Sequence, residues 1–132
     1  TQGVSSAASD VYKRQASKLT TRFNYMLGPL FESLATLSVR AAVQAVFGRV
    51  GHFRTTKGDR EIDLIAQDQD GSIIAIEVKL TANVTDDDVR HLTWFRDQLP
   101  DDVVDLVVLN TGTRAYRRPD GVAVIPLGLL GE

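Results

Sequence analysis

The stretch from Ser72 to Leu80 constrains the fold more than any other part of the chain. It is rich in isoleucine and valine, as a buried β-strand is, yet it carries Glu77 and Lys79 close to its end. Side chains alternate along a strand, so Glu77 and Lys79 share one face while Ile74 and Ile76 share the other. The sequence therefore predicts an interior strand that places a carboxylate and an ammonium group side by side.

A second strand, Glu61 to Gln67, determines where another carboxylate falls. Its apolar side chains join the apolar face of the first strand only if Leu64 lies opposite Ile76. That register places Asp63 directly opposite Glu77, in the pattern D-x13-E-x-K, and it requires an odd-numbered loop such as 69–71. The residues that this register assigns to the apolar face are Ile62, Leu64, Ala66, Ile74, Ile76 and Val78.

Two carboxylates at cross-strand distance are a metal-binding arrangement. In a partly desolvated site both stay charged only if a cation joins them, and hard oxygen ligands suit Mg²⁺ or Mn²⁺. Such an ion would polarise a phosphoryl oxygen and lower the pKa of a bound water, while Lys79 stabilises charge in the transition state. This is the chemistry of phosphodiester hydrolysis. The alternatives are a solvated or salt-bridged face for Glu77 and Lys79, and a lone structural acceptor at Asp63.

Around this strand pair the sequence predicts an α/β fold. A helix begins at Gly28-Pro29 and runs to about Phe47, and it carries Glu32 on a face of small apolar residues. A second helix begins at Thr85, a capping hydroxyl followed by three aspartates. The order is helix, three strands, helix, strand and a final β pair, in a mixed sheet flanked by helices. The further elements expected are a strand at 52–56, a fully buried strand at 103–109, and a pair formed by 114–118 and 122–125.

Composition removes several classes of function. There is no cysteine, so disulfide frameworks and thiolate metal sites are excluded, and the chain fits the cytoplasm. No apolar run approaches the roughly eighteen residues of a membrane span, so no membrane partner is expected. The net charge of −2 leaves no large basic footprint for duplex DNA, and any nucleic-acid contact has to be local.

The first fifteen residues do not read as part of a domain. Residues 5–15, SSAASDVYKRQ, match the in-frame translation of a transposase-type sequencing-library adapter, the alternative being a polar disordered tail. We therefore expect residues 1–15 to be artefactual or disordered and residues 16–132 to form a single domain. On this interpretation the reading frame was cut at its 5′ end, and the domain is the C-terminal fragment of a longer protein.

The segment from Gly28 to the C-terminus resembles the PD-(D/E)XK nuclease superfamily. It is more closely similar to an uncharacterised domain at the C-terminal end of many prokaryotic AAA-type ATPases. The segments that carry the likeness are LFESL, FRTTKGDREIDLIAQ, IEVKL, DVRHLTWF, VVLNTG and GVAVIPLGLL. The proline that precedes the metal-binding aspartate in the superfamily is replaced here by Ile62.

The resemblance implies a restriction-endonuclease-like fold and a role for each matched residue. Asp63, Glu77 and Val78 would hold Mg²⁺ or Mn²⁺, Lys79 would be catalytic, and Glu32 would support the site. The implied substrate is DNA, and the implied partner is an upstream ATPase, because no G-x-x-x-x-G-K-[ST] loop occurs in this chain. Two other functions stay open: a non-catalytic module that docks DNA or a protein beside the ATPase, and a purely structural domain with an exposed apolar patch.

A few other residues are candidate ligand contacts. Tyr116, with arginines at 114, 117 and 118, has the composition to stack a base and contact phosphate, the alternative being a solvated hairpin. His91 and Trp94 resemble auxiliary DNA-contacting residues of some nucleases. The alternatives are a partly buried histidine and a core or interface tryptophan. We assign no role to His52.

Overall fold

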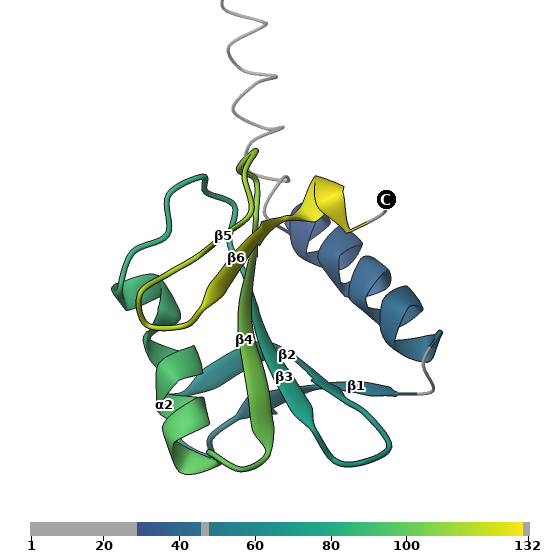
Figure 1. Cartoon of the computed structure of the whole chain (residues 1–132), viewed down its shortest axis with the longest axis vertical. Helices are drawn as coiled ribbons and strands as arrows, with labels where there is room; N and C mark the ends of the chain where they lie inside the picture. Colours follow the sequence, from purple (N-terminus) through teal and green to yellow (C-terminus); the bar gives the residue numbers. More distant parts are fainter. Residues whose placement is uncertain (1–28, 46–47, 131–132) are drawn as a thin grey trace, which may run out of the picture. The chain divides into compact units, whose positions relative to one another are not determined.

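The computed structural model describes residues 29–45 and 48–130. By its internal contacts the chain divides into two units, residues 1–31 and residues 32–132, and each is described by itself. Of the first unit only the helical residues 29–31 are described; everything below concerns the second unit (Figure 1). The prediction for residues 1–15, and those parts of the first predicted helix that fall at 28 and 46–47, lie outside the described residues.

A six-stranded mixed sheet is the centre of the fold. Its strand order is β1-β2-β3-β4-β6-β5. The pairs β1/β2, β2/β3 and β5/β6 are antiparallel, whereas β3/β4 and β4/β6 are parallel. This confirms the predicted α/β class. The strands are β1 (Arg49–Arg54), β2 (Glu61–Gln67), β3 (Ile73–Val78), β4 (Val103–Asn110), β5 (Tyr116–Arg117) and β6 (Ala123–Pro126).

Helices occur where capping signals predicted them. The first helix is described over residues 29–44, and α2 covers Arg90–Gln98. A 3₁₀ turn at Asp87–Val89 precedes α2, and another at Leu127–Leu129 follows β6. The Thr85 N–H donates to the Asp88 carboxylate at 2.9 Å, and the Asp88 N–H donates back to the Thr85 hydroxyl at 3.4 Å. This reciprocal capping box confirms the predicted start, although the first turn is 3₁₀ rather than α.

The main core lies between the sheet and α2, on the side where α2 is drawn in Figure 1. Leu92 of α2 is fully buried, and the ring of Phe95 lies 5.3 Å from that of Phe53 on β1. Each such buried side chain contributes about 1.5–3 kcal/mol. The buried members of this cluster are Ile62, Ala75, Val89, Leu92, Phe95, Val103, Leu106, Val108, Val122 and Val124.

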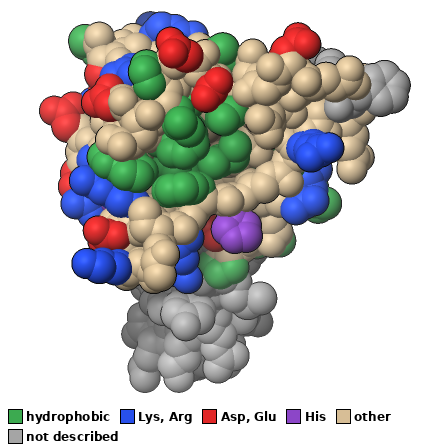
Figure 2. All heavy atoms as spheres, turned by 90° about the horizontal axis from the view of Figure 1, so that it is seen from below, with side chains coloured by type: hydrophobic (Ala, Val, Ile, Leu, Met, Phe, Trp, Pro, Cys, Tyr) green, Lys and Arg blue, Asp and Glu red, His purple; other side chains and the backbone are tan. Residues whose placement is uncertain are grey.

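The opposite face of the sheet is only partly covered. The first helix buries Ala35 and Val39, while Leu34 on its other stripe stays 49% exposed. Val104 is 61% exposed, so the prediction of a fully buried strand at 103–109 is wrong at this position. Val104 and Ile74 line an apolar cavity of about 120 Å³ near the β2–β3 loop. Figure 2 shows hydrophobic side chains gathered between charged ones on one face.

The predicted pairing of β2 with β3 is confirmed from Leu64 to Gln67, whereas the predicted pair of Asp63 with Glu77 is not part of the ladder. Leu64 lies opposite Ile76, and the ladder continues to Gln67 opposite Ile73. The Asp68 N–H donates to the Ser72 carbonyl at 3.0 Å, which leaves the predicted odd-numbered loop 69–71 to reverse the chain. Gly71 has a φ of 88°, in the left-handed region that suits glycine in such a turn.

One part of the predicted register is wrong, because β2 contains a β-bulge. Gly51 of β1 pairs with Ile65, but Phe53 pairs with Ile62, so two β2 residues lie opposite His52 alone. A bulge of this kind reverses the alternation of the residues that precede it. Ile62 therefore leaves the predicted apolar face and joins the core under α2.

Among the described residues, no helix combines the length and the apolar character that crossing a membrane requires.

Candidate functional site

Asp63 is one of the two bulged residues of β2. Asp63 and Leu64 both line the cavity beneath the first helix, as expected where two successive side chains of a bulge turn to the same side. The Asp63 Oδ2 accepts the backbone N–H of Val78 at 2.9 Å. The side chain thus holds the end of β3, just beyond the last β2–β3 pair, Leu64 with Ile76.

The cavity has a volume of about 400 Å³ and brings together three strands and the first helix. Two of the predicted site residues, Glu32 and Asp63, line it, and so does Val78. Its side chains carry three carboxylates against one arginine, so it favours a cationic occupant. The lining residues are Glu32, Thr36, Arg40, Gly51, His52, Glu61, Asp63, Leu64 and Val78.

Glu77 is buried next to Asp63 rather than in the cavity wall. Its residue is only 6% exposed, and its Oε1 has no hydrogen-bond partner among the described residues. Burial, together with the neighbouring charge of Asp63, raises the pKa of Glu77 to about 9. Without a cation, therefore, Glu77 is protonated at neutral pH.

Lys79 follows the end of β3 and is half-buried. Its backbone N–H donates to the Leu109 carbonyl at 2.9 Å, which continues the parallel pairing with β4 past the last residue of β3. Its positive charge acts against the rise in the pKa of Glu77, so the ammonium group lies within electrostatic range of that carboxyl. The structure thus brings Asp63, Glu77 and Lys79 together.

Glu32 lies further from this group. It is exposed on the first helix, and it shares the cavity with Asp63. Within residues 29–45 and 48–130, no three acidic or histidine residues come close enough to hold one metal ion. Glu32 therefore does not complete a single shell with Asp63 and Glu77.

Sequence reasoning missed Arg40, His52 and Glu61, which line the cavity with Asp63. His52 had no assigned role, yet it is the residue opposite the bulge. The alternation of β2 gives no sign of this, because Ile62, Leu64 and Ala66 keep the pattern of a regular strand. The helical spacing of Arg40 from Glu32, two turns apart, was the one available signal.

His91, in the first turn of α2, lies within electrostatic range of Lys79. Burial lowers the pKa of His91, and the positive charges of Arg90, Arg60 and Lys79 lower it further. Trp94 packs against the core and its ring lies 6.0 Å from that of Phe53, with the Arg60 guanidinium 5.0 Å from the tryptophan ring. This placement agrees with the partly buried histidine and the core tryptophan.

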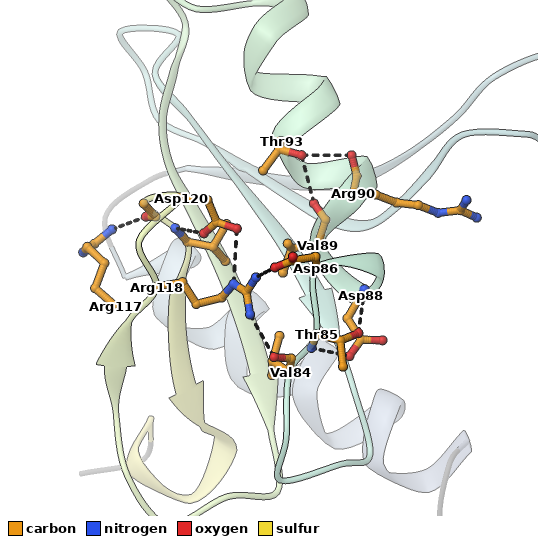
Figure 3. A network of polar contacts seen from close by, with 12 residues as sticks. Val84, Thr85, Asp86, Asp88, Val89, Arg90, Thr93, Arg117, Arg118 and Asp120 are labelled. Carbon is orange, nitrogen blue, oxygen red and sulfur yellow. Dashed lines mark hydrogen bonds and ion pairs between the residues drawn. The ribbon is translucent and has the colours of Figure 1, made fainter.

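Two of the three arginines in the final hairpin are bound to acids of the same chain. Arg118 is only 11% exposed and donates to the Val84 carbonyl at 2.8 Å, to Asp120 at 3.2 Å and to Asp86 (Figure 3). Arg117 pairs with Asp105 at 2.9 Å. These two side chains hold the hairpin in place.

The site and the fold together define a mixed α/β domain with a buried glutamate, a half-buried aspartate and a lysine at one end of its central strands. A sequence model of one family, the domain of unknown function DUF4143, matches residues 27–130. The chain belongs to this family. No curated protein and no solved structure matches the chain.

Proposed function

We propose that this domain is a divalent-metal-dependent nuclease-like domain that hydrolyses DNA phosphodiester bonds, joined in its native setting to an AAA-type ATPase. The observation that carries the proposal is the burial of Glu77 beside Asp63, with an Oε1 that has no partner among the described residues. A buried carboxylate oxygen without a donor is unfavourable for stability alone, and a bound cation would relieve it.

The residues at this position fit Mg²⁺ or Mn²⁺. Mg²⁺ is usually held by one or two carboxylates, with water and substrate phosphate completing its shell, so two acids are enough for such a site. Asp63 and Glu77 would supply the carboxylates, and Val78, between Glu77 and Lys79, the backbone. When bound, the ion would polarise a phosphoryl oxygen and activate a water.

The other residues of the site would act directly on the substrate. Lys79 would stabilise the negative charge that develops on the phosphoryl oxygens, since its ammonium group lies within range of Glu77. Arg40 and His52 would contact phosphates that flank the reacting one, because they line the same cavity as Asp63. Glu32 would orient water at the opposite wall.

The ATPase would supply the directed motion along DNA that this domain has no sequence motif to provide. The support for this part is the similarity of the chain to the C-terminal domain of such ATPases. The net charge of −2 fits a domain that is brought to DNA by a partner, since it attracts little duplex by itself.

The alternative is a non-catalytic module that docks DNA or a protein beside the ATPase. The exposed apolar surface around Ile74 and Val104 favours it, because contiguous apolar patches mark interaction sites. The two functions differ in what Asp63, Glu77 and Lys79 do: a docking module keeps partner binding when they are replaced, whereas an enzyme loses turnover.

Calorimetric titration of Mn²⁺, beside a plasmid-nicking assay on the same samples, tests the proposal. Asp63→Asn keeps an oxygen acceptor for the Val78 N–H and removes the charge, so we expect a folded variant that neither binds Mn²⁺ nor nicks DNA. The matched control is Asp70→Asn, on the exposed β2–β3 turn, which should behave as the wild type. A wild-type domain that binds no Mn²⁺ would contradict the metal site, and equal nicking by the Asp63 variant would contradict its role.

A further inference from the structure

Another cavity lies at the carboxyl ends of the parallel strands β3 and β4, and the proposed function leaves it unused. Its volume is about 380 Å³, and its walls come from the loop after Lys79 and the loop after Asn110. Crevices outside the carboxyl ends of parallel strands are where open α/β sheets bind ligands. The residues that line this cavity, the β4-end pocket, are Ala82, Asn83, Gly112, Thr113, Arg114 and Tyr116.

Asn110 contacts both loops that form the pocket. It is 1% exposed, and its Nδ2 donates to the Ala82 carbonyl at 3.2 Å. A Cβ atom at Gly112 would lie only 3.2 Å from the same Nδ2, so the absence of a side chain there lets the amide pack beneath the loop. The Asn110 Oδ1 has no hydrogen-bond partner among the described residues. Asn110 itself does not line the pocket, so its role is to position the two loops.

Hydrogen bonds within the loop after Lys79 fix its conformation without a ligand. The Thr81 hydroxyl donates to the Asn83 carbonyl at 3.1 Å, and the Asn83 N–H donates to the same hydroxyl at 3.3 Å. These bonds fold the loop back on itself, in addition to the bond from Asn110. The pocket is therefore preorganised, which reduces the entropy lost on binding.

Arg114 differs from the other arginines of its hairpin. Arg117 and Arg118 are both bound to acids, whereas Arg114 makes no ion pair or hydrogen bond with any of the described residues. It is exposed, and it lines the pocket with Tyr116, whose residue is 44% exposed on the edge strand β5. A free guanidinium beside an exposed ring is suited to a phosphate attached to a planar base.

We propose that the β4-end pocket binds one nucleotide, with the base stacked on Tyr116 and the phosphate paired with Arg114. Binding requires neither Asp63 nor a metal ion, so this inference goes beyond the proposed function. The nucleotide is either free or an unpaired residue of a single strand, and the chemistry recognised is the same.

The test measures binding to the 132-residue chain in EDTA. Anisotropy of a labelled single-stranded oligonucleotide gives Kd over a range of salt concentrations, and calorimetry with AMP tests a free nucleotide. Tyr116→Ala should raise Kd on the order of tenfold or more. Arg114→Gln should reduce the slope of log K against log salt by about 0.7. The matched control is Arg49→Gln, on the other edge strand, which should change neither.

The outcomes separate the sources of the ligand. Binding of AMP that competes with the oligonucleotide supports a free-nucleotide site, and binding of the oligonucleotide alone supports a strand site. The proposal would be overturned if neither AMP nor the oligonucleotide binds. It would also be overturned if Arg49→Gln changes binding as much as the variants of Arg114 and Tyr116 do. If Tyr116→Ala does not fold, Tyr116→Leu removes the ring and keeps an apolar strand residue. A chain carrying Asp63→Asn should still bind the oligonucleotide, so failure of the nuclease proposal and failure of this one are distinguishable.

Discussion

Replacing Glu77 by glutamine should stabilise the metal-free protein at neutral pH and remove a pH dependence of its stability. Glu77 is 6% exposed, and its pKa is raised from the ordinary value of 4.5 to about 9. Between these two values the folded protein binds a proton that the unfolded chain has released. The free energy of unfolding therefore falls as the pH rises through this window, and the contribution is fully present only below about pH 4.5.

The size of the effect follows from the linkage relation. Each pH unit inside the window changes the free energy of unfolding by at most about 1.4 kcal/mol. Relative to Glu77→Gln, the wild type should therefore lose at most about 4 kcal/mol between about pH 5 and pH 8. Glutamine keeps the shape of the side chain and has no proton to lose. The free energy of unfolding of Glu77→Gln therefore lacks this dependence on pH.

Urea unfolding of both proteins in EDTA, followed by circular dichroism across that pH range, measures the difference. Glu61→Gln is the control, because that glutamate is exposed on the same strand as Asp63, and burial is the main cause of the shift at Glu77. Parallel curves for wild type and Glu77→Gln would show that Glu77 is ionised in the folded protein. In that case the argument that Asp63 and Glu77 need a cation between them fails.

Two further perturbations test the hairpin that follows β4. Arg118→Met should lower the free energy of unfolding by about 2–4 kcal/mol, since it leaves the Val84 carbonyl and the partly buried Asp120 without their donor. Arg117→Met, whose ion pair lies at the surface, should cost less by the same urea titration, and equal losses would refute this assignment. Gly121→Ala should lower the melting temperature, because Gly121 has a φ of 91° that alanine adopts only with strain of about 1 kcal/mol or more. An unchanged melting temperature would contradict that reasoning.

The pairing of β2 with β3 could be predicted because one face of each strand has to be apolar. A register that places Leu64 opposite Ile76 leaves few choices for the loop, and the structure has both the register and the loop at 69–71. The capping residues at Thr85 and Asp88 were equally informative, since their hydrogen bonds form within a few residues of the chain. The capping depends on residues close together in the chain, and the strand pairing depends on the two-residue alternation of side chains along a strand.

The β2 bulge could not be predicted, because it depends on how β1 pairs with β2. Regular alternation of Ile62, Leu64 and Ala66 is compatible with a strand that has no bulge. The decisive contact is that of Phe53 with Phe95, which draws the β1 end toward α2 and with it Ile62. The side chains that line the cavity, such as His52, are placed by that long-range packing, and no pattern in the sequence indicates them.

The partners of the arginines at 117 and 118 could not be predicted from the sequence either. Arg117 reaches Asp105 on β4, and Arg118 reaches Asp86 in the loop before α2. The sequence does not distinguish a paired arginine from an unpaired one, because these two acidic partners lie far away in the chain and come close only in the tertiary structure. The distinction matters for function, because it leaves Arg114 as the arginine of this hairpin with no partner among the described residues.

The bulge also means that the position of Asp63 is encoded by residue count as well as residue type. Deleting one residue from the bulged pair would restore a regular ladder and exchange the faces of all β2 residues before it, so that Ile62 would leave the core and Glu61 would enter it. A substitution at Leu64 has no such effect. Single-residue insertions and deletions in β2 should therefore be much less tolerated than substitutions, and length variation in this family should concentrate in the β2–β3 loop, outside the ladder.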